Sequence, residues 1–401
     1  MEVFAKHDMK ILLLGEYSNV HWTLAEGLRA LGHQVCVVSH GDFWKNYQRD
    51  ISLVRPTQSR WDGLRYLAKL LMTLPKLRGY DVVQLINPCF LELKAERLLP
   101  IYKYLRRHNA KVFLGGYGMD YYWVHTCRTT QTFRYSDFNF GTTLRDSADI
   151  RHELSDWIDT PKSRLNQYIA ADCDGIPTGL YEYYACYQPH FPEKTAFIPF
   201  PINLERLSRK KPRGEAAPVK FFIGIQRARS EYKGTDIMLR ALERLHKAYP
   251  DRCEIVKAES VPYNEYQHMM DTSDVILDQL YSYTPAMNAL LAMGKGLIVV
   301  GGGEPENYDI LHETELRPII NVLPDEADVY RQLEQLVLHP QRIAQLSADS
   351  RKYVERHHNH VKVAAQYVEF WKESGRRGKV EGGGCKVEGG GCKVEGGRWK
   401  V

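Results

Sequence analysis

The chain has 401 residues, of which 44% are hydrophobic and 26% are charged, and its net charge is +5. A single hydrophobic core stops growing well below this length, so the sequence predicts a globular protein of two domains rather than a disordered or fibrous one. No apolar run approaches the roughly 20 residues of a membrane span, and the run from Ile11 to Leu14 is too short for a signal peptide. We therefore expect a cytoplasmic protein.

The first half of the chain alternates apolar runs with helical patterns. Lys10 to Gly15 reads KILLLG, then comes TLAEGLRALGH with helical spacing, then QVCVVS. This order predicts a βαβ unit with Gly32 after the end of its helix, because strands buried on both faces of a parallel sheet are apolar throughout. Later strand candidates are Tyr80–Ile86, Lys111–Gly116 and Cys173–Thr178.

Two prolines mark a boundary between domains. From Phe197 the sequence reads FIPFPIN, and Pro199 and Pro201 favour an extended connector. We assign residues 1–200 to an N-terminal domain and residues 201–350 to a second domain. VKFFIGI begins a new alternation of strands and helices, which predicts an α/β architecture of two facing Rossmann-like, doubly wound domains.

The C-terminal part divides into a helix and a tail. Residues 351–375 form a helical tract whose apolar stripe must pack on an existing surface, and we expect this helix to cross back to the first domain. Residues 376–401 repeat KVEGGGC with a period of seven. Three glycines per repeat disfavour a helix, so this tail is predicted to be disordered.

The segment from Asp274 to Glu306 has the order of an anion-binding site. A buried strand is followed by a polar break, a Thr-Pro helix start, a second strand, and then GGGEPE. We expect Thr284 to cap a helix whose first residue is Pro285. The free amides of this helix start, within residues 285–287, then face a ligand beyond the strand ends, and a diphosphate is the usual one.

This segment and the two-domain layout resemble the retaining, nucleotide-sugar-dependent glycosyltransferases of the GT-B fold, of the family 4 type. In that family a G-R…K-G pattern holds the diphosphate. Here GIQRARSEYKGTD matches at Gly224 and at Lys233-Gly234, and the arginine is displaced to Arg227 or Arg229. The resemblance implies a diphosphate site, and its candidate residues are Arg227, Arg229, Lys233, Thr284, Pro285 and Ala286.

One motif departs from the family. Its E-x7-E signature places glutamates at positions that are Tyr281 and Ala289 here, which leaves open the identity of the donor and, beyond that, the activity. GGGEPE matches the family text G-G-x-P-E, which borders the sugar. The candidate contacts of the donor sugar and nucleoside are Asp278, Gln279, Asn288, Gly302, Gly303, Glu304 and Glu306.

Two segments of the first domain are expected on the interdomain cleft. The loop GEYSNVHW contains Gly15, Ser18 and Asn19 as acceptor contacts and His21 as a catalytic candidate, with a purely structural histidine as the alternative. Asp120, in GYGMDYYW, is the second catalytic candidate. Tyr121 beside it is a candidate acceptor contact, because sugars stack on aromatic rings and bond to carboxylates.

Positive charge is concentrated early in the chain. Residues 51–111 contain twelve Lys and Arg but four Asp and Glu, and Arg60 to Tyr80 places leucines and Trp61 at helical spacing beside cations. Such a helix is suited to an anionic membrane surface, at the inner face of a membrane. An ordinary core-facing helix with a solvated cationic side is the alternative.

The resemblance, together with these patterns, implies a hexosyltransferase-type glycosyltransferase. The expected substrates are a nucleoside diphosphate-sugar and a saccharide or lipid-linked acceptor, in cell-surface polysaccharide or glycolipid synthesis. Retention of configuration follows from the resemblance. We expect no separate cofactor, no metal and no nucleic acid partner. Two alternatives remain: a non-catalytic nucleotide-sugar-binding relative, and a sugar-nucleotide epimerase of the same fold.

Overall fold

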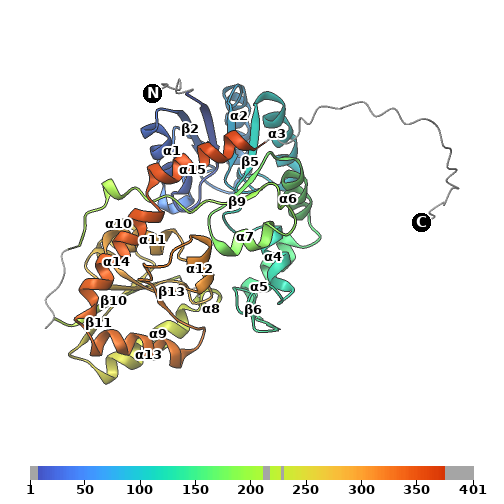
Figure 1. Cartoon of the computed structure of the whole chain (residues 1–401). Coiled ribbons are helices and arrows are strands. Elements are labelled where there is room, and N and C mark those ends of the chain that lie inside the picture. The colour runs from blue at the N-terminus through green and yellow to red at the C-terminus, as the bar shows by residue number, and fades with distance from the viewer. Residues whose placement is uncertain (1–7, 211–216, 227–229, 375–401) are drawn as a thin grey trace, which may run out of the picture.

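The computed structural model describes residues 8–210, 217–226 and 230–374, and within them the chain forms two α/β units, each around a five-stranded parallel sheet (Figure 1). The predicted architecture of two doubly wound Rossmann-like domains is confirmed. The repeat tail, residues 376–401, lies outside the described residues, so the prediction of its disorder stays a prediction.

The first sheet has the strand order β3-β2-β1-β4-β5. Ile11 to Leu14 are fully buried, as expected of a central strand with helices on both faces. The strands are β1 (Lys10–Leu14), β2 (Gln34–Ser39), β3 (Ile51–Ser52), β4 (Val82–Leu85) and β5 (Lys111–Leu114). The helices are α1 (Val20–Ala30), α2 (Arg60–Thr73), α3 (Ala95–His108), α4 (Tyr121–Arg128), α5 (Ala148–Trp157), α6 (Pro161–Asp172) and α7 (Tyr181–Tyr187).

Short strands extend this unit. β8 (Ile176–Thr178) pairs with β9 (Thr195–Phe197) and bridges to the end of β5, so the predicted strand 173–178 adjoins the first sheet. Between α4 and α5, the strands β6 (Asn139–Phe140) and β7 (Thr143–Leu144) form an antiparallel hairpin. In Figure 1 this hairpin lies below α4 and α5, beside the second unit.

The second sheet has the order β11-β10-β12-β13-β14. Its strands are β10 (Val219–Ile225), β11 (Cys253–Glu259), β12 (Val275–Leu277), β13 (Ile298–Gly301) and β14 (Ile320–Asn321). Its helices are α8 (Ser230–Lys233), α9 (Thr235–Ala248), α10 (Tyr263–Asp271), α11 (Met287–Lys295), α12 (Pro305–Ile310), α13 (Glu326–Leu338) and α14 (Arg342–His357). All strands of each sheet are parallel, and the order in which the chain adds them changes direction between β1 and β4 and between β10 and β12. Ligands of such sheets bind at the carboxyl ends of the strands beside this point.

The closing tract returns to the first domain, as predicted, but as two helices rather than one. α14 ends at His357, and Asn359 caps α15 (His360–Glu373) by accepting from the amides of Val361 and Lys362. α15 packs on α1 so closely that a Cβ on Gly27 would lie 2.2 Å from the carbonyl oxygen of His360. Figure 1 shows α15 lying across the first domain.

Candidate functional site

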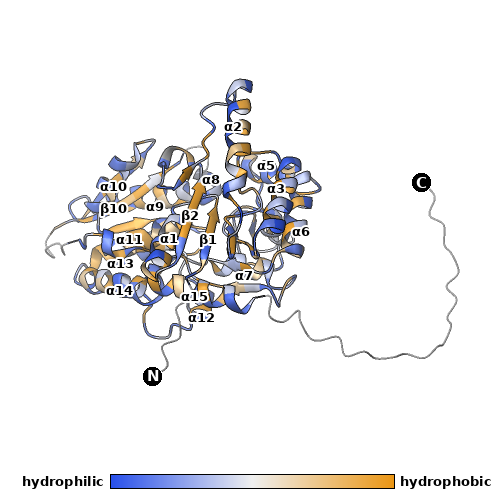
Figure 2. Ribbon diagram, turned by 90° about the horizontal axis from the view of Figure 1, so that it is seen from above, coloured by the Kyte–Doolittle hydropathy of each residue, from blue (hydrophilic) through white to orange (hydrophobic). Residues whose placement is uncertain are grey.

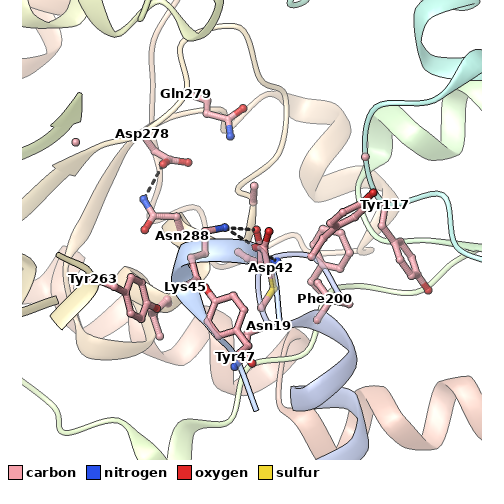
Figure 3. Close-up of a pocket in the computed structure, with 18 of the residues that line it drawn as sticks. Asn19, Asp42, Lys45, Tyr47, Tyr117, Phe200, Tyr263, Asp278, Gln279 and Asn288 are labelled. Carbon is pink, nitrogen blue, oxygen red and sulfur yellow. Dashed lines mark hydrogen bonds and ion pairs between the residues drawn. The ribbon is translucent and has the colours of Figure 1, made fainter. Parts of the chain in front are cut away.

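A cavity of about 1210 Å³ lies between the two domains. Residues after β1, β2, β4 and β5 line it from the first domain, and residues after β10, β11 and β12 line it from the second. Figure 3 shows Asp278, Gln279 and Asn288 of the second domain opposite Asn19, Asp42 and Lys45 of the first. The carboxyl ends of both sheets therefore converge on one space.

Lys233 lies on the wall of this cavity, at the end of the one-turn helix α8. Its carbonyl oxygen accepts from the amide of Leu280, with an N–O distance of 3.1 Å. Gly234, which follows, has φ +72°, and a Cβ there would lie 2.7 Å from the Cβ of Leu280. A glycine is therefore needed to bring the lysine backbone against the end of β12.

Asp278 and Asn288 form a hydrogen-bonded pair on the same wall. The Nδ2 of Asn288 donates to Oδ1 of Asp278 over 3.0 Å, and the Tyr266 hydroxyl donates to Oδ1 of Asn288 over 3.3 Å. Burial raises the pKa of Asp278, and the bond from Asn288 and the charge of Lys233 act against the rise. The structure thus brings three of the predicted donor residues together: Lys233, Asp278 and Asn288.

Gln279 and Ala286 also line the cavity, and the N-terminus of α11 faces it through Ala286, Met287 and Asn288. The first amides of a helix have no partner within the helix and favour an anion. The other two predicted cations, Arg227 and Arg229, lie outside the described residues. Among the described residues, no cluster of three or more His, Cys, Asp or Glu has the arrangement of a metal site.

The predicted capping role of Thr284 is wrong. α11 begins at Met287, two residues later than expected, and Thr284 is buried away from the cavity wall together with Pro285. Its hydroxyl donates to Oε2 of Glu182 over 2.5 Å, and its amide and that of Tyr283 donate to Oε1 over 3.1 and 2.6 Å. A carboxylate of the first domain therefore binds Thr284 and the turn just before α11, so Thr284 is not available to a diphosphate.

The assignment of GGGEPE to the donor sugar is also corrected. Arg134 of the first domain pairs with Glu304 over 2.9 Å and with Glu306. A Cβ on Gly302 would lie 2.4 Å from the carbonyl oxygen of Ser282, and the amide of Gly303 donates to Asn321. Gly302, Gly303 and Glu304 are buried and Glu306 is partly exposed, and none of these four residues lines the cavity.

Two of the four predicted acceptor contacts reach the cavity. Ser18 and Asn19 line it, both in the left-handed backbone conformation with φ 51° and 69°. The Ser18 amide donates to Oδ2 of Asp42 over 2.9 Å, and Lys45 pairs with the same oxygen over 2.6 Å. The first domain thus presents a small polar cluster to the ligand space.

The cavity is not lined by His21, Gly15 or Tyr121. His21 is fully buried, its Nδ1 lies 2.8 Å from the carbonyl oxygen of Gly15, and burial lowers its pKa to about 3. The Tyr121 ring packs on Tyr122. The catalytic assignment of His21 is therefore replaced by the structural alternative, a histidine that joins β1 to α1.

Asp120 is likewise a structural carboxylate in this conformation. It caps α4 by accepting from the amide of Trp123 over 2.9 Å, and its other oxygen accepts from the Tyr187 hydroxyl over 2.6 Å. Its side chain is buried outside the cavity wall, and burial raises its pKa to about 6.

The Asp120→Asn variant is therefore expected to keep its turnover within a few-fold of the wild type, because an asparagine oxygen still caps α4. A loss of about 100-fold or more in kcat, with an unchanged melting temperature, would instead be the behaviour of a catalytic carboxylate.

Several residues that line the cavity were not predicted from the sequence. Tyr263 and Tyr266 come from α10, and the Tyr47 ring of the first domain meets that of Tyr263 edge to face with centroids 6.0 Å apart. Asp42 and Lys45 belong to the loop after β2. The one signal available in the sequence was position: each of these residues follows a predicted parallel strand, where the carboxyl edge of the sheet faces a ligand.

Comparisons with known proteins agree with this layout. No protein-family model and no curated protein sequence matches the chain. Among solved structures, HepE from Anabaena in complex with UDP and glucose has a TM-score of 0.57 at 12% identity, over 91% of this chain and 100% of that one. Sucrose-phosphate synthase from Thermosynechococcus elongatus has a TM-score of 0.56 at 15% identity, over 91% and 98%.

A third neighbour is an epimerase. The UDP-GlcNAc 2-epimerase from Neisseria meningitidis, bound to UDP-GlcNAc, has a TM-score of 0.51 at 12% identity, over 90% of this chain and 99% of that one. At these identities the likeness concerns the fold. The chain has the GT-B fold, with two Rossmann-like domains that face each other across a cavity.

Proposed function

We propose that the chain is a glycosyltransferase of the hexosyltransferase type. It transfers a sugar from a nucleoside diphosphate donor to a saccharide or lipid-linked acceptor, with retention of configuration, in cell-surface polysaccharide or glycolipid synthesis. The observation that carries the proposal is Lys233 on the cavity wall, in the same cavity as the N-terminus of α11. A cation and free amides together stabilise the negative charge that grows on a leaving diphosphate.

The rest of the cavity agrees with such a donor. Asp278 and Asn288 offer a carboxylate and an amide to ribose or sugar hydroxyls, in place of the two glutamates that the chain lacks. Tyr263 and Tyr266 offer aromatic faces for a base. The cluster of Asp42 and Lys45 on the first domain is the proposed place of the acceptor. HepE, which was solved with UDP and glucose, and the epimerase, which was solved with UDP-GlcNAc, support a sugar nucleotide as the ligand class.

The test is consumption of UDP-, GDP- and ADP-hexoses in the presence of alkyl glycosides and a glycolipid mixture. We expect one donor to release its nucleoside diphosphate only when an acceptor is present, and the product to keep the anomeric configuration of the donor by NMR. Tight donor binding without turnover across the panel would instead identify a binding protein. Isomerised donor in the absence of acceptor would identify an epimerase.

The exposed face of α2 supports membrane attachment, which we propose as part of this function. Four apolar side chains on it are more than half exposed: Trp61 75%, Leu64 59%, Leu71 58% and Met72 71%. The exposed cations Arg60, Arg65 and Lys69 belong to the same helix. Figure 2 shows α2 projecting from the body of the protein. Within the described ranges, no helix has the length and apolar content to cross a membrane.

We expect the chain to co-float with phosphatidylglycerol vesicles at low salt and to remain in the bottom fraction when the vesicles are phosphatidylcholine. Each cation at an anionic surface contributes about 1 kcal/mol, and the apolar side chains add burial in the interface. The double variant Trp61→Ser, Leu64→Ser should lose most of the bound fraction, whereas Leu323→Ser, at a half-exposed leucine of the second domain, should not. Absence of co-flotation by the wild type at low salt would end the membrane proposal.

A further inference from the structure

A segment of the first domain, residues 129–147 between α4 and α5, lies against the second domain, and we call it the strap. It contains the hairpin of β6 and β7 (Figure 1). Phe133, Tyr135 and Phe138 of the strap are buried, and the Asn139 side chain donates to the carbonyl oxygens of Phe133 and Gly141 over 2.9 Å each. The strap is therefore an ordered element with side chains of its own at its centre.

Arg145 connects the strap to helix α8. Its guanidinium donates to the carbonyl oxygens of Glu231 and Tyr232 over 2.6 and 3.2 Å. Carbonyls at the end of a one-turn helix have few partners of their own, so a fixed cation stabilises them. The same guanidinium lies 3.6 Å above the centre of the Tyr281 ring, at a position where the resembled family has a glutamate.

Asp137 holds the same helix from a second direction. Its Oδ2 accepts from the Tyr232 hydroxyl over 2.8 Å, and Asp137 and Tyr232 both line the cavity. The ring of Phe138 meets that of Tyr232 edge to face, with centroids 6.4 Å apart. Three side chains of the strap thus fix the residue that immediately precedes Lys233.

The strap is itself anchored on the second domain. Arg134 pairs with Glu304 and Glu306, its amide donates to the Tyr283 hydroxyl over 2.7 Å, and Tyr135 donates to Glu304. These contacts hold the strap, and Arg145 with it, in a fixed position relative to α8. Arg145 lies behind the cavity wall rather than on it, so any effect on a ligand acts through the backbone of residues 231–233.

We propose that the strap sets the position of Lys233 for the donor diphosphate, with Arg145 and Asp137 as positioning residues. The proposal rests on the proposed function, because it takes a nucleoside diphosphate as the ligand. It adds that the donor site on the second domain is complete only when the first domain holds α8 in place. The domain contact and donor binding are then coupled through Tyr232.

The experiment compares Arg145→Ala and Tyr232→Phe with the wild type by two measurements. Hydrogen exchange of amides 230–236 in the ligand-free chain should be faster in both variants. Calorimetry with UDP and uridine, and with GDP and guanosine, should show that the preference for diphosphate over nucleoside falls by about tenfold or more, the usual effect of losing a charge-assisted hydrogen bond. Tyr232→Phe removes one hydroxyl, so it tests the proposal even where Arg145→Ala folds poorly.

Arg151→Ala is the matched control, because Arg151 lies close by on α5 and pairs with Asp146 at an exposed site. It should leave exchange and preference unchanged. Faster exchange with unchanged preference in the two variants would overturn the proposal, since the strap would then stabilise α8 without setting the diphosphate site. If the wild type bound no nucleoside diphosphate, the proposed function would fail first, and this proposal with it.

Discussion

Lys233→Ala is expected to weaken nucleoside diphosphate binding by roughly 30- to 150-fold and to leave nucleoside binding unchanged. The lysine lies on the cavity wall, and its backbone is fixed by the bond from the Leu280 amide. Its charge acts on the diphosphate alone, and a hydrogen bond between charged groups contributes about 2 to 3 kcal/mol. Calorimetry with UDP and uridine, and with GDP and guanosine, separates the contribution of the diphosphate to the affinity from that of the nucleoside.

Lys257→Ala is the control for this substitution. Lys257 lies on β11 of the same domain, pairs with Glu259 and is exposed outside the cavity wall. Removing it changes the net charge by the same amount and should leave both affinities unchanged. Equal losses of diphosphate and nucleoside in Lys233→Ala, or no loss of either, would remove Lys233 from the diphosphate site.

Glu182→Ala is expected to lower the melting temperature by roughly 5 °C or more, because it leaves several buried donors without an acceptor. The carboxylate accepts from the amides of Tyr283 and Thr284 and from the hydroxyls of Ser282 and Thr284. It joins α7 of the first domain to the turn that leads into α11. Since Ala286 and Met287 follow this turn on the cavity wall, nucleoside diphosphate binding should weaken as well.

Glu182→Gln separates lost hydrogen bonds from a general loss of packing. A glutamine keeps the carbonyl oxygen that can replace Oε1, which accepts three of the four bonds, and it has nearly the same volume. The melting temperature of Glu182→Gln, measured by differential scanning calorimetry, should therefore lie much closer to that of the wild type. A melting temperature of Glu182→Ala equal to that of the wild type would show that the turn does not depend on this carboxylate.

The fold could be predicted because its signals are local. The runs that form β1, β10 and β13 are almost entirely apolar, since helices cover both faces of a parallel sheet, and the glycines and prolines between them mark their ends. The sequence predicted that the closing helix packs on the first domain, but it did not predict that the helix is interrupted at His358. That break depends on the capping side chain of Asn359, and the apolar stripe of the tract does not show it.

The site could be predicted only in part, because long-range contacts decide the remainder. Lys233, Asp278 and Asn288 follow strands that share one sheet edge, so spacing alone brings them together. Thr284 and Glu304 face Glu182 and Arg134, which are more than a hundred residues away in sequence. The local sequence does not show that Glu182 accepts from two amides of a distant turn or that Arg134 pairs with two distant glutamates.

The most direct measurement is a crystal structure of the chain soaked with UDP and, separately, with GDP. One of the two should bind in the interdomain cavity, with its diphosphate within hydrogen-bond distance of the Nζ of Lys233 and of the first amides of α11, and with its base beside Tyr263 and Tyr266. A nucleotide bound outside this cavity, or with its diphosphate away from Lys233, would contradict the assignment of the donor site.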